Sequence, residues 1–277
     1  YKREHLDPLK RSHSIFTDGG DQPNVVPSKA TIWYYFRDVT YQGIMEMYAT
    51  ANDIAKGASL MTGTEVNSEI LGTAWPRHFN KVIAETMYEN ILQVGLPEWS
   101  DNDQNLAKAV QKQVNAPSEF DGLAVALNPI GLPITEPKSG GSDDIGDISW
   151  KVPTVTLRYP SNIPGLQGHH WSNAIAMATP IAHKGVISGA QVEAMTLLDF
   201  LLKPELVSQA WKYFDEEQAS KQKYIPMVGV KDEPAVNLNT MIMENFAPKL
   251  KPFYYDETKY DSYMEQLGIT YPTLKKE

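Results

Sequence analysis

Side chains that can do chemistry gather in the stretch of residues 139–170. A glycine-rich acidic loop opens the stretch, a short β-branched run follows, and two adjacent histidines close it. The five residues in question are Asp143, Asp144, Asp147, His169 and His170. Carboxylates and imidazoles are the groups that hydrolytic and metal sites use. The stretch therefore indicates part of a hydrolytic or metal-binding site.

Each of these residues also has an ordinary structural explanation. His169 and His170 follow a glycine and precede a predicted helix, so they could simply lead into it. Neighbouring side chains of an extended chain point to opposite sides, so the two imidazoles cannot both face one metal there. Three close carboxylates could hold a cation or could form a turn and a helix cap, and their spacing does not fit an EF-hand loop. The residue types leave both explanations open.

Asn24 and Arg37 form a second candidate set. Arg37 ends the strongest predicted strand, and its planar guanidinium suits a carboxylate. Asn24 follows a Gly-Gly-Asp-Gln-Pro turn, where its amide can donate and accept hydrogen bonds. A surface cation and a turn residue are the alternative roles. The sequence contains no nucleophile elbow, P-loop or Rossmann fingerprint, and the absence of cysteine excludes a thiol nucleophile.

Composition limits the class of protein and of partner. The 277 residues suffice for one large domain or two ordinary ones. A formal net charge of −9 argues against nucleic acid or an anionic membrane as the main partner. The most apolar run, residues 190–202, is interrupted by Glu193 and Asp199 and predicts a core helix. We expect a cytoplasmic protein, with the periplasm as the alternative.

The expected elements divide the chain near residue 72. Before this point, strands at 10–16, 30–37 and 65–71 and a helix capped by Thr40 predict an antiparallel sheet with a helix on one face. After this point we expect mainly helices, one strand, a long loop at 115–140 and a surface-wrapping tail from residue 218. The expected helices are 80–94, 101–114 with Asp101 or Asn102 as cap, 171–182, 188–202 and 204–214, and the strand is 152–157.

Several motifs resemble one known family. The run TDGGDQPNVVP at residues 17–27 resembles the lid-domain signature of the dinuclear zinc exopeptidases and amidohydrolases, a family that contains carboxypeptidase G, aminoacylases and indoleacetyl-amino-acid hydrolases. Residues 141–150, 168–171 and 182–185 are similar to its aminobenzoyl-glutamate hydrolase branch. The resemblance extends over residues 1 to about 215.

The resemblance implies an α/β protein made of parts of two domains. Residues 1–72 would be the later part of an α+β ferredoxin-like lid and dimerisation domain. Residues 73–277 would be the C-terminal half of an α/β/α catalytic metallohydrolase domain. The implied activity is hydrolysis of the amide bond of N-acyl or N-aroyl amino acids, of the aminobenzoyl-glutamate type, or of small peptides.

The resemblance also implies roles for single residues. His169 would be a metal ligand, and His170 stands where relatives usually carry serine, so either imidazole could face the metal. Asn24 and Arg37 would bind the carboxylate of the substrate or its developing oxyanion, and Asp144 would support the site. The complete enzyme would hold two zinc ions, or manganese or cobalt, and would form a homodimer through the lid, with a second subunit as a further expectation.

The remaining machinery of this family lies in the N-terminal half of its catalytic domain. This sequence opens at Tyr1 like the last turn of a helix already under way, and we expect native residues before it. The other metal ligands, the bridging carboxylate and the general base would lie there, so no catalytic residue is assigned in this chain. One histidine does not hold a catalytic zinc, and the chain alone is expected to be inactive. The alternatives are a non-catalytic binding or assembly subunit and a stand-alone ligand-binding module.

Overall fold

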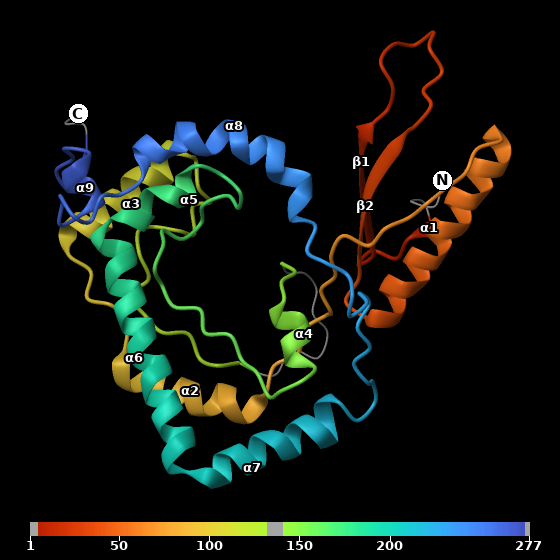
Figure 1. Cartoon of the computed structure of the whole chain (residues 1–277). Coiled ribbons are helices and arrows are strands. Elements are labelled where there is room, and N and C mark those ends of the chain that lie inside the picture. Colours follow the sequence, from red (N-terminus) through yellow and green to blue (C-terminus); the bar gives the residue numbers. More distant parts are fainter. Residues whose placement is uncertain (1–4, 132–140, 275–277) are drawn as a thin grey trace. The chain divides into compact units, whose positions relative to one another are not determined.

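The computed structural model describes residues 5–131 and 141–274 and divides the chain into two compact units (Figure 1). The first unit comprises residues 1–78, 133–152 and 221–235, and the second comprises residues 79–132, 153–220 and 236–277. Each unit thus joins segments that are far apart in the sequence. The predicted lid and catalytic domains stay predictions. The opening at Tyr1 and the first residues of the acidic stretch, Ser139 and Gly140, lie outside the described residues.

A β-hairpin forms one end of the first unit. Strands β1 (Arg11–Asp18) and β2 (Thr31–Arg37) are antiparallel, with Arg11 opposite Arg37 and an irregularity between Phe16 and Asp18. Both strands are confirmed near their predicted places. They are rich in aromatic and β-branched residues, which favour extended chain.

Helix α1 (Tyr41–Thr62) follows the hairpin and packs against β2. The Thr40 hydroxyl accepts a hydrogen bond from the Gly43 N–H at 3.1 Å, which confirms the predicted cap. Gly43 has no side chain for a reason: a Cβ there would lie 1.5 Å from Asp38 Oδ2. Gly63 ends the helix in the left-handed conformation at a φ of 65°.

Two predicted strands are wrong. Residues 64–80 contain neither helix nor strand, and residues 65–71 are mostly polar and exposed, so they bury no face of a sheet. Residues 152–157 are also not a strand: Pro153 cannot donate to a ladder, and the Thr154 carbonyl accepts from the Asn80 N–H at 2.8 Å. Within the described residues the sheet has only β1 and β2. Helices with this small sheet are compatible with the α/β class.

The second unit is built on helices with clear capping signals. Helix α2 (Lys81–Val94) is capped by Asn80, and α3 (Asp101–Gln113) by Ser100 in a capping box with Asp103. The predicted caps of α3, Asp101 and Asn102, are wrong because the Ser100 hydroxyl is the group that accepts from the Asp103 N–H.

The two helices predicted at 171–182 and 188–202 are arranged differently. Helix α5 (Ser172–Ile175) and a 3-10 turn η2 (Ala176–Ala178) stop before Thr179, which is extended because Pro180 follows it. Helix α6 (Pro180–Leu202) then runs without interruption, and α7 (Pro204–Tyr213) follows as predicted. The remaining elements are α4 (Ile145–Ser149) in the first unit and η3 (Phe214–Gln218), η4 (Val236–Asn239), α8 (Thr240–Leu250), η5 (Lys251–Phe253) and α9 (Tyr263–Gln266) in the second.

Apolar packing and buried amides hold the second unit together. Its main core gathers side chains from α3, the following loop, residue 163, η2 and the start of α6, namely Leu106, Ala107, Val110, Leu123, Ile163, Ala176 and Ile181. Helix α2 contacts α6 and α7. The buried Asn90 amide donates to Thr196 and Asp199 of α6 at 3.1 and 2.9 Å. Buried amides with several partners fix one arrangement of these helices.

Helix α6 is long and apolar enough to cross a membrane, by length and composition, among the helices that the structure describes. The predicted run from residue 190 alone was too short for this, because the helix starts ten residues earlier. A core helix of a globular protein meets the same criterion.

The tail after residue 218 is mostly exposed, as predicted, but its end is anchored. The Tyr271 hydroxyl donates to Asp103 Oδ1 at 2.6 Å, and Lys184 Nζ lies 2.7 Å from Asp103 Oδ2. Burial alone would raise the pKa of Asp103, but the hydrogen bonds from Lys184, Tyr271 and Ser100 outweigh it and lower the pKa to about 2.

We expect Asp103→Asn to lower the free energy of unfolding by about 2 kcal/mol at neutral pH, because the folded state binds the ionised carboxylate. The pKa is depressed on folding, so this contribution is complete above the unfolded value of 3.8 and is lost as the pH falls towards 2. Urea unfolding between pH 6 and pH 3 measures both effects. Asp101→Asn, an exposed acid on the same helical turn, is the control, and equal losses in the two variants would contradict the prediction.

Candidate functional site

The acidic loop and α4 lie in the first unit, and each of the three aspartates has a different environment. Asp143 pairs with Arg77, with 3.3 Å between Oδ2 and Nη1. Asp144 stands at the N-cap position of α4, is exposed, and makes no side-chain capping bond. Asp147 is half-buried and faces inward. The aspartates therefore do not act as one cation-binding set.

Asp147 is a structural anchor. Its Oδ2 accepts from the Trp75 N–H at 3.1 Å, and its Oδ1 accepts from the Tyr224 hydroxyl at 2.9 Å. Burial and the bond to Asp147 raise the pKa of Tyr224, which keeps the hydroxyl protonated as a donor. These two bonds join residues 75, 147 and 224, which are distant in the sequence, into one cluster.

An aromatic cluster surrounds this anchor. The Trp75 ring is 2% exposed and stacks on Tyr41 at 4.2 Å between centroids. Its Nε1 donates to the Ile225 carbonyl at 3.0 Å. Trp150 Nε1 donates to the Pro76 carbonyl at 2.7 Å. Loop and chain thus hold each other through buried N–H groups, which would be costly to leave unsatisfied.

His78 packs edge-on against the Trp150 ring at 4.3 Å in the same cluster. Burial lowers the pKa of His78 to about 4. Its imidazole is therefore neutral at pH 7. Sequence reasoning did not single it out, because no acid or histidine lies at ligand spacing from it.

Two guanidinium groups contact the acidic loop. Arg37 Nη2 donates to Ser142 Oγ at 3.2 Å, although 105 residues separate them. Arg77 Nη2 donates to the Gly141 carbonyl at 3.3 Å, beside its ion pair with Asp143. Arg37 therefore lies beside the loop that carries Asp144, and Arg77 is a neighbour that sequence spacing could not reveal.

Asn24 lies away from this place. It is exposed in the connection 19–30, which extends beyond the far ends of β1 and β2 in Figure 1, whereas Arg37 lies at the opposite end of β2. Seven residues of strand span about 20 Å at roughly 3.3 Å per residue. One small substrate cannot touch Asn24 and Arg37 of the same hairpin in this conformation.

The two histidines lie in the second unit and differ from each other. His170 Nδ1 is 2.8 Å from Ser172 Oγ and accepts from the Ser172 N–H at 3.4 Å, so this imidazole supports the start of α5. His169 is exposed and has a φ of 56°. A left-handed residue with a side chain costs roughly 1–2 kcal/mol, and such strain is found most often at functional sites.

A metal ion would need more ligands than these residues supply. No group of three or more histidine, aspartate or glutamate side chains gathers anywhere in residues 5–131 and 141–274. His169 offers one imidazole, and His170 is engaged through Nδ1. The described residues do not by themselves fit a catalytic zinc site, which normally has about three protein ligands.

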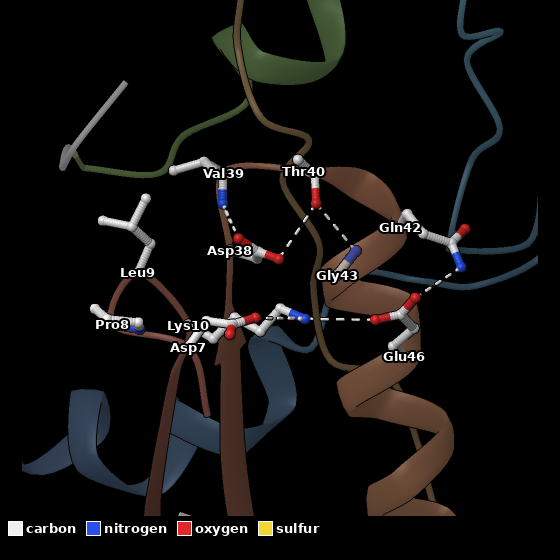
Figure 2. A pocket seen from close by; sticks show the side chains of 10 residues that line it. All are labelled: Asp7, Pro8, Leu9, Lys10, Asp38, Val39, Thr40, Gln42, Gly43 and Glu46. Atoms are coloured by element: carbon white, nitrogen blue, oxygen red, sulfur yellow. Dashed lines mark hydrogen bonds and ion pairs between the residues drawn. The ribbon is translucent and has the colours of Figure 1, made fainter. Parts of the chain in front are cut away.

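A hollow of about 530 Å³ lies between the start of β1 and the start of α1 (Figure 2). Its charged groups pair with each other: Lys10 Nζ lies 3.4 Å from both Asp7 Oδ2 and Glu46 Oε2. None of the predicted site residues is among those that line it. This hollow is therefore no continuation of the predicted site.

Gly146 is required at the contact between α4 and residue 75. A Cβ there would lie 2.0 Å from the Trp75 carbonyl oxygen, whereas a Cβ at Gly141 would meet nothing within 4 Å. We expect Gly146→Ala to lower the free energy of unfolding by roughly 1–3 kcal/mol through overpacking. Gly141→Ala in the same loop is the control. Denaturant unfolding followed by tryptophan fluorescence measures both, and equal stability of the two variants would contradict the close packing.

Three known proteins are similar to this chain over most of its length. One is a subunit of the p-aminobenzoyl-glutamate hydrolase of Escherichia coli, which is 25% identical over 249 residues, or 82% of this chain and 52% of that protein. The Xaa-Arg dipeptidases of Mus musculus and Homo sapiens are 26% and 27% identical over 76% and 74% of this chain, and over 42% and 40% of their own lengths.

The chain thus spans about half the length, or somewhat less, of the curated relatives it matches. No family model matches it. The names of the relatives agree with the family that the motifs at residues 17–27, 141–150 and 168–171 indicate. The chain is a homologue of the p-aminobenzoyl-glutamate hydrolase subunit and of the Xaa-Arg dipeptidases, which are hydrolases of the M20 peptidase family.

Proposed function

We propose that this chain is part of a metal-dependent amidohydrolase that cleaves the amide bond of an N-acyl or N-aroyl amino acid or of a small peptide. The observation that carries the proposal is the similarity to hydrolases over 82% of the chain. The contact of Arg37 with the acidic loop supports it, because a cation then lies at one of the motifs that resemble the family rather than on a remote surface.

In this proposal the first unit binds the carboxylate of the substrate. Arg37 offers a planar fork of N–H donors, which matches a carboxylate in a bidentate pair. Asp144 supports the loop beside it. Asn24 acts at a site to which a different hairpin contributes, since one hairpin holds it far from its own Arg37. This arrangement agrees with a homodimer formed through the hairpin unit, and a second kind of subunit in the same assembly is a further part of the proposal.

The metal site of this proposal is shared with residues outside the described part of the chain. His169 supplies one imidazole, and His170 is the alternative ligand. Zinc, or manganese or cobalt, would supply a Lewis acid when bound, two ions in the complete enzyme. The general base is also expected elsewhere, so the present residues bind and orient the substrate. We place the enzyme in the cytoplasm, with the periplasm as the alternative.

The second candidate function is a non-catalytic binding or assembly subunit. It is favoured by one observation: the described residues gather no three metal-ligating side chains. Incubating the protein, as its complete gene encodes it, with zinc and p-aminobenzoyl-glutamate, N-acyl amino acids and dipeptides distinguishes the two. Turnover that a chelator abolishes supports the hydrolase, and binding of these compounds without turnover supports the non-catalytic role.

We expect Arg37→Ala to raise KM for carboxylate-bearing substrates roughly 10-fold or more, a loss of about 1.4 kcal/mol of binding. Arg37→Lys should restore only part of it, because an ammonium keeps the charge and loses the fork. Arg11→Ala is the control, since Arg11 lies opposite Arg37 in the hairpin and is exposed. Steady-state kinetics on the complete enzyme gives the result, and an unchanged KM in Arg37→Ala would exclude the carboxylate role.

We expect His169→Ala to lower the metal content of the complete protein, because it removes one ligand. Elemental analysis of the purified protein measures this, with His183→Ala as the control for an exposed histidine in the same unit. Full occupancy in His169→Ala together with loss in His170→Ala would move the ligand by one residue. Full occupancy in both variants would exclude the metal role of this motif.

A further inference from the structure

Helix α6 has two apolar faces, and only one of them is buried in its unit. Positions 181, 185, 189, 192 and 196 form the buried face. The opposite side carries large exposed side chains over about four turns of helix; Leu201 is 67% and Val186 is 62% exposed. We call this side the α6 stripe, and it consists of Val186, Ile187, Ala190, Leu197, Leu198 and Leu201.

The spacing of the stripe is regular. Its members recur at intervals of three, four and seven residues, which is the repeat of one helix face. A helix that is apolar on all sides is normally buried on all sides. Large apolar patches on a protein surface mark places where another surface binds. The stripe therefore needs a cover.

We infer that the α6 stripe is a docking surface for the remaining part of a longer hydrolase, a polypeptide that the present 277 residues do not include. The curated relatives are matched over only 52%, 42% and 40% of their lengths, so each holds roughly as much chain again. This inference rests on the proposed function, since both treat the chain as one part of such a hydrolase.

A lipid bilayer fits the stripe less well than a protein surface does. The other side of α6 is tied to α2 by the bonds of the Asn90 amide to Thr196 and Asp199, so lipid cannot surround the helix. Glu193 is exposed at the border of the stripe, and a formal net charge of −9 disfavours an anionic membrane. A second copy of the chain would add no new sequence and would leave the length of the relatives unexplained.

The chain has no cysteine, so a single introduced thiol reports the exposure of one position. Leu201→Cys and Leu197→Cys probe the stripe in the protein as its complete gene encodes it. Gln113→Cys, at an exposed position of α3 in the same unit, is the matched control. The rate of maleimide labelling is measured without substrate under native conditions and again in denaturant, together with intact and native mass.

We expect both stripe thiols to react roughly tenfold or more slowly than the control under native conditions and equally fast in denaturant, because a covered site reacts only when it opens. We also expect a polypeptide mass above 31.0 kDa, or a second, different polypeptide in the complex.

Four outcomes would overturn the inference. They are native labelling as fast as the control, protection in a monomer of 31.0 kDa, protection in a complex of identical 31.0 kDa chains, and protection that requires a membrane or detergent. Labelling is independent of turnover, so fast labelling in an active hydrolase refutes only the docking surface. Slow labelling in a complex without hydrolase activity refutes only the proposed function.

Discussion

The carboxylate of Asp147 determines how the first unit is assembled. It accepts one hydrogen bond from the main chain of Trp75 and one from the hydroxyl of Tyr224, and so joins three parts of the chain. The loop that precedes it is thereby held within reach of Arg37 and Arg77. A buried carboxylate is tolerated only with such partners. The position of the candidate substrate-binding loop thus depends on a residue that cannot itself bind the substrate.

Elements that carry their own local signal could be predicted from the sequence. Thr40 and Asn80 cap helices where expected, and Pro204 starts α7 after α6 ends. The strands predicted at 65–71 and 152–157 failed, because a strand is stabilised by its neighbours and local composition does not reveal them. Ser100 was missed as a cap beside the more acidic Asp101 and Asn102, although its capping box with Asp103 was readable.

The candidate site was predictable only in part, for the same physical reason. Residue types identified the acidic loop and the histidines, and they could not tell a ligand from a support. Asp147 turned out to be a support because its partner Tyr224 is 77 residues away, and Arg77 reaches the loop from 66 residues before Asp143. His170 likewise supports α5 through Ser172, while His169 is left exposed in a strained conformation.

The hairpin of the first unit has a consequence for handling the protein. β2 contains the segment TIWYYF, which is aromatic and uncharged, and Trp33, Tyr34 and Tyr35 are all exposed. A two-stranded sheet also keeps open backbone edges on both sides. Segments of this kind recruit identical segments from other molecules into cross-β assemblies. During synthesis the hairpin is therefore an aggregation hazard until something covers it, and producing the chain together with its covering partner is the safer route to soluble material.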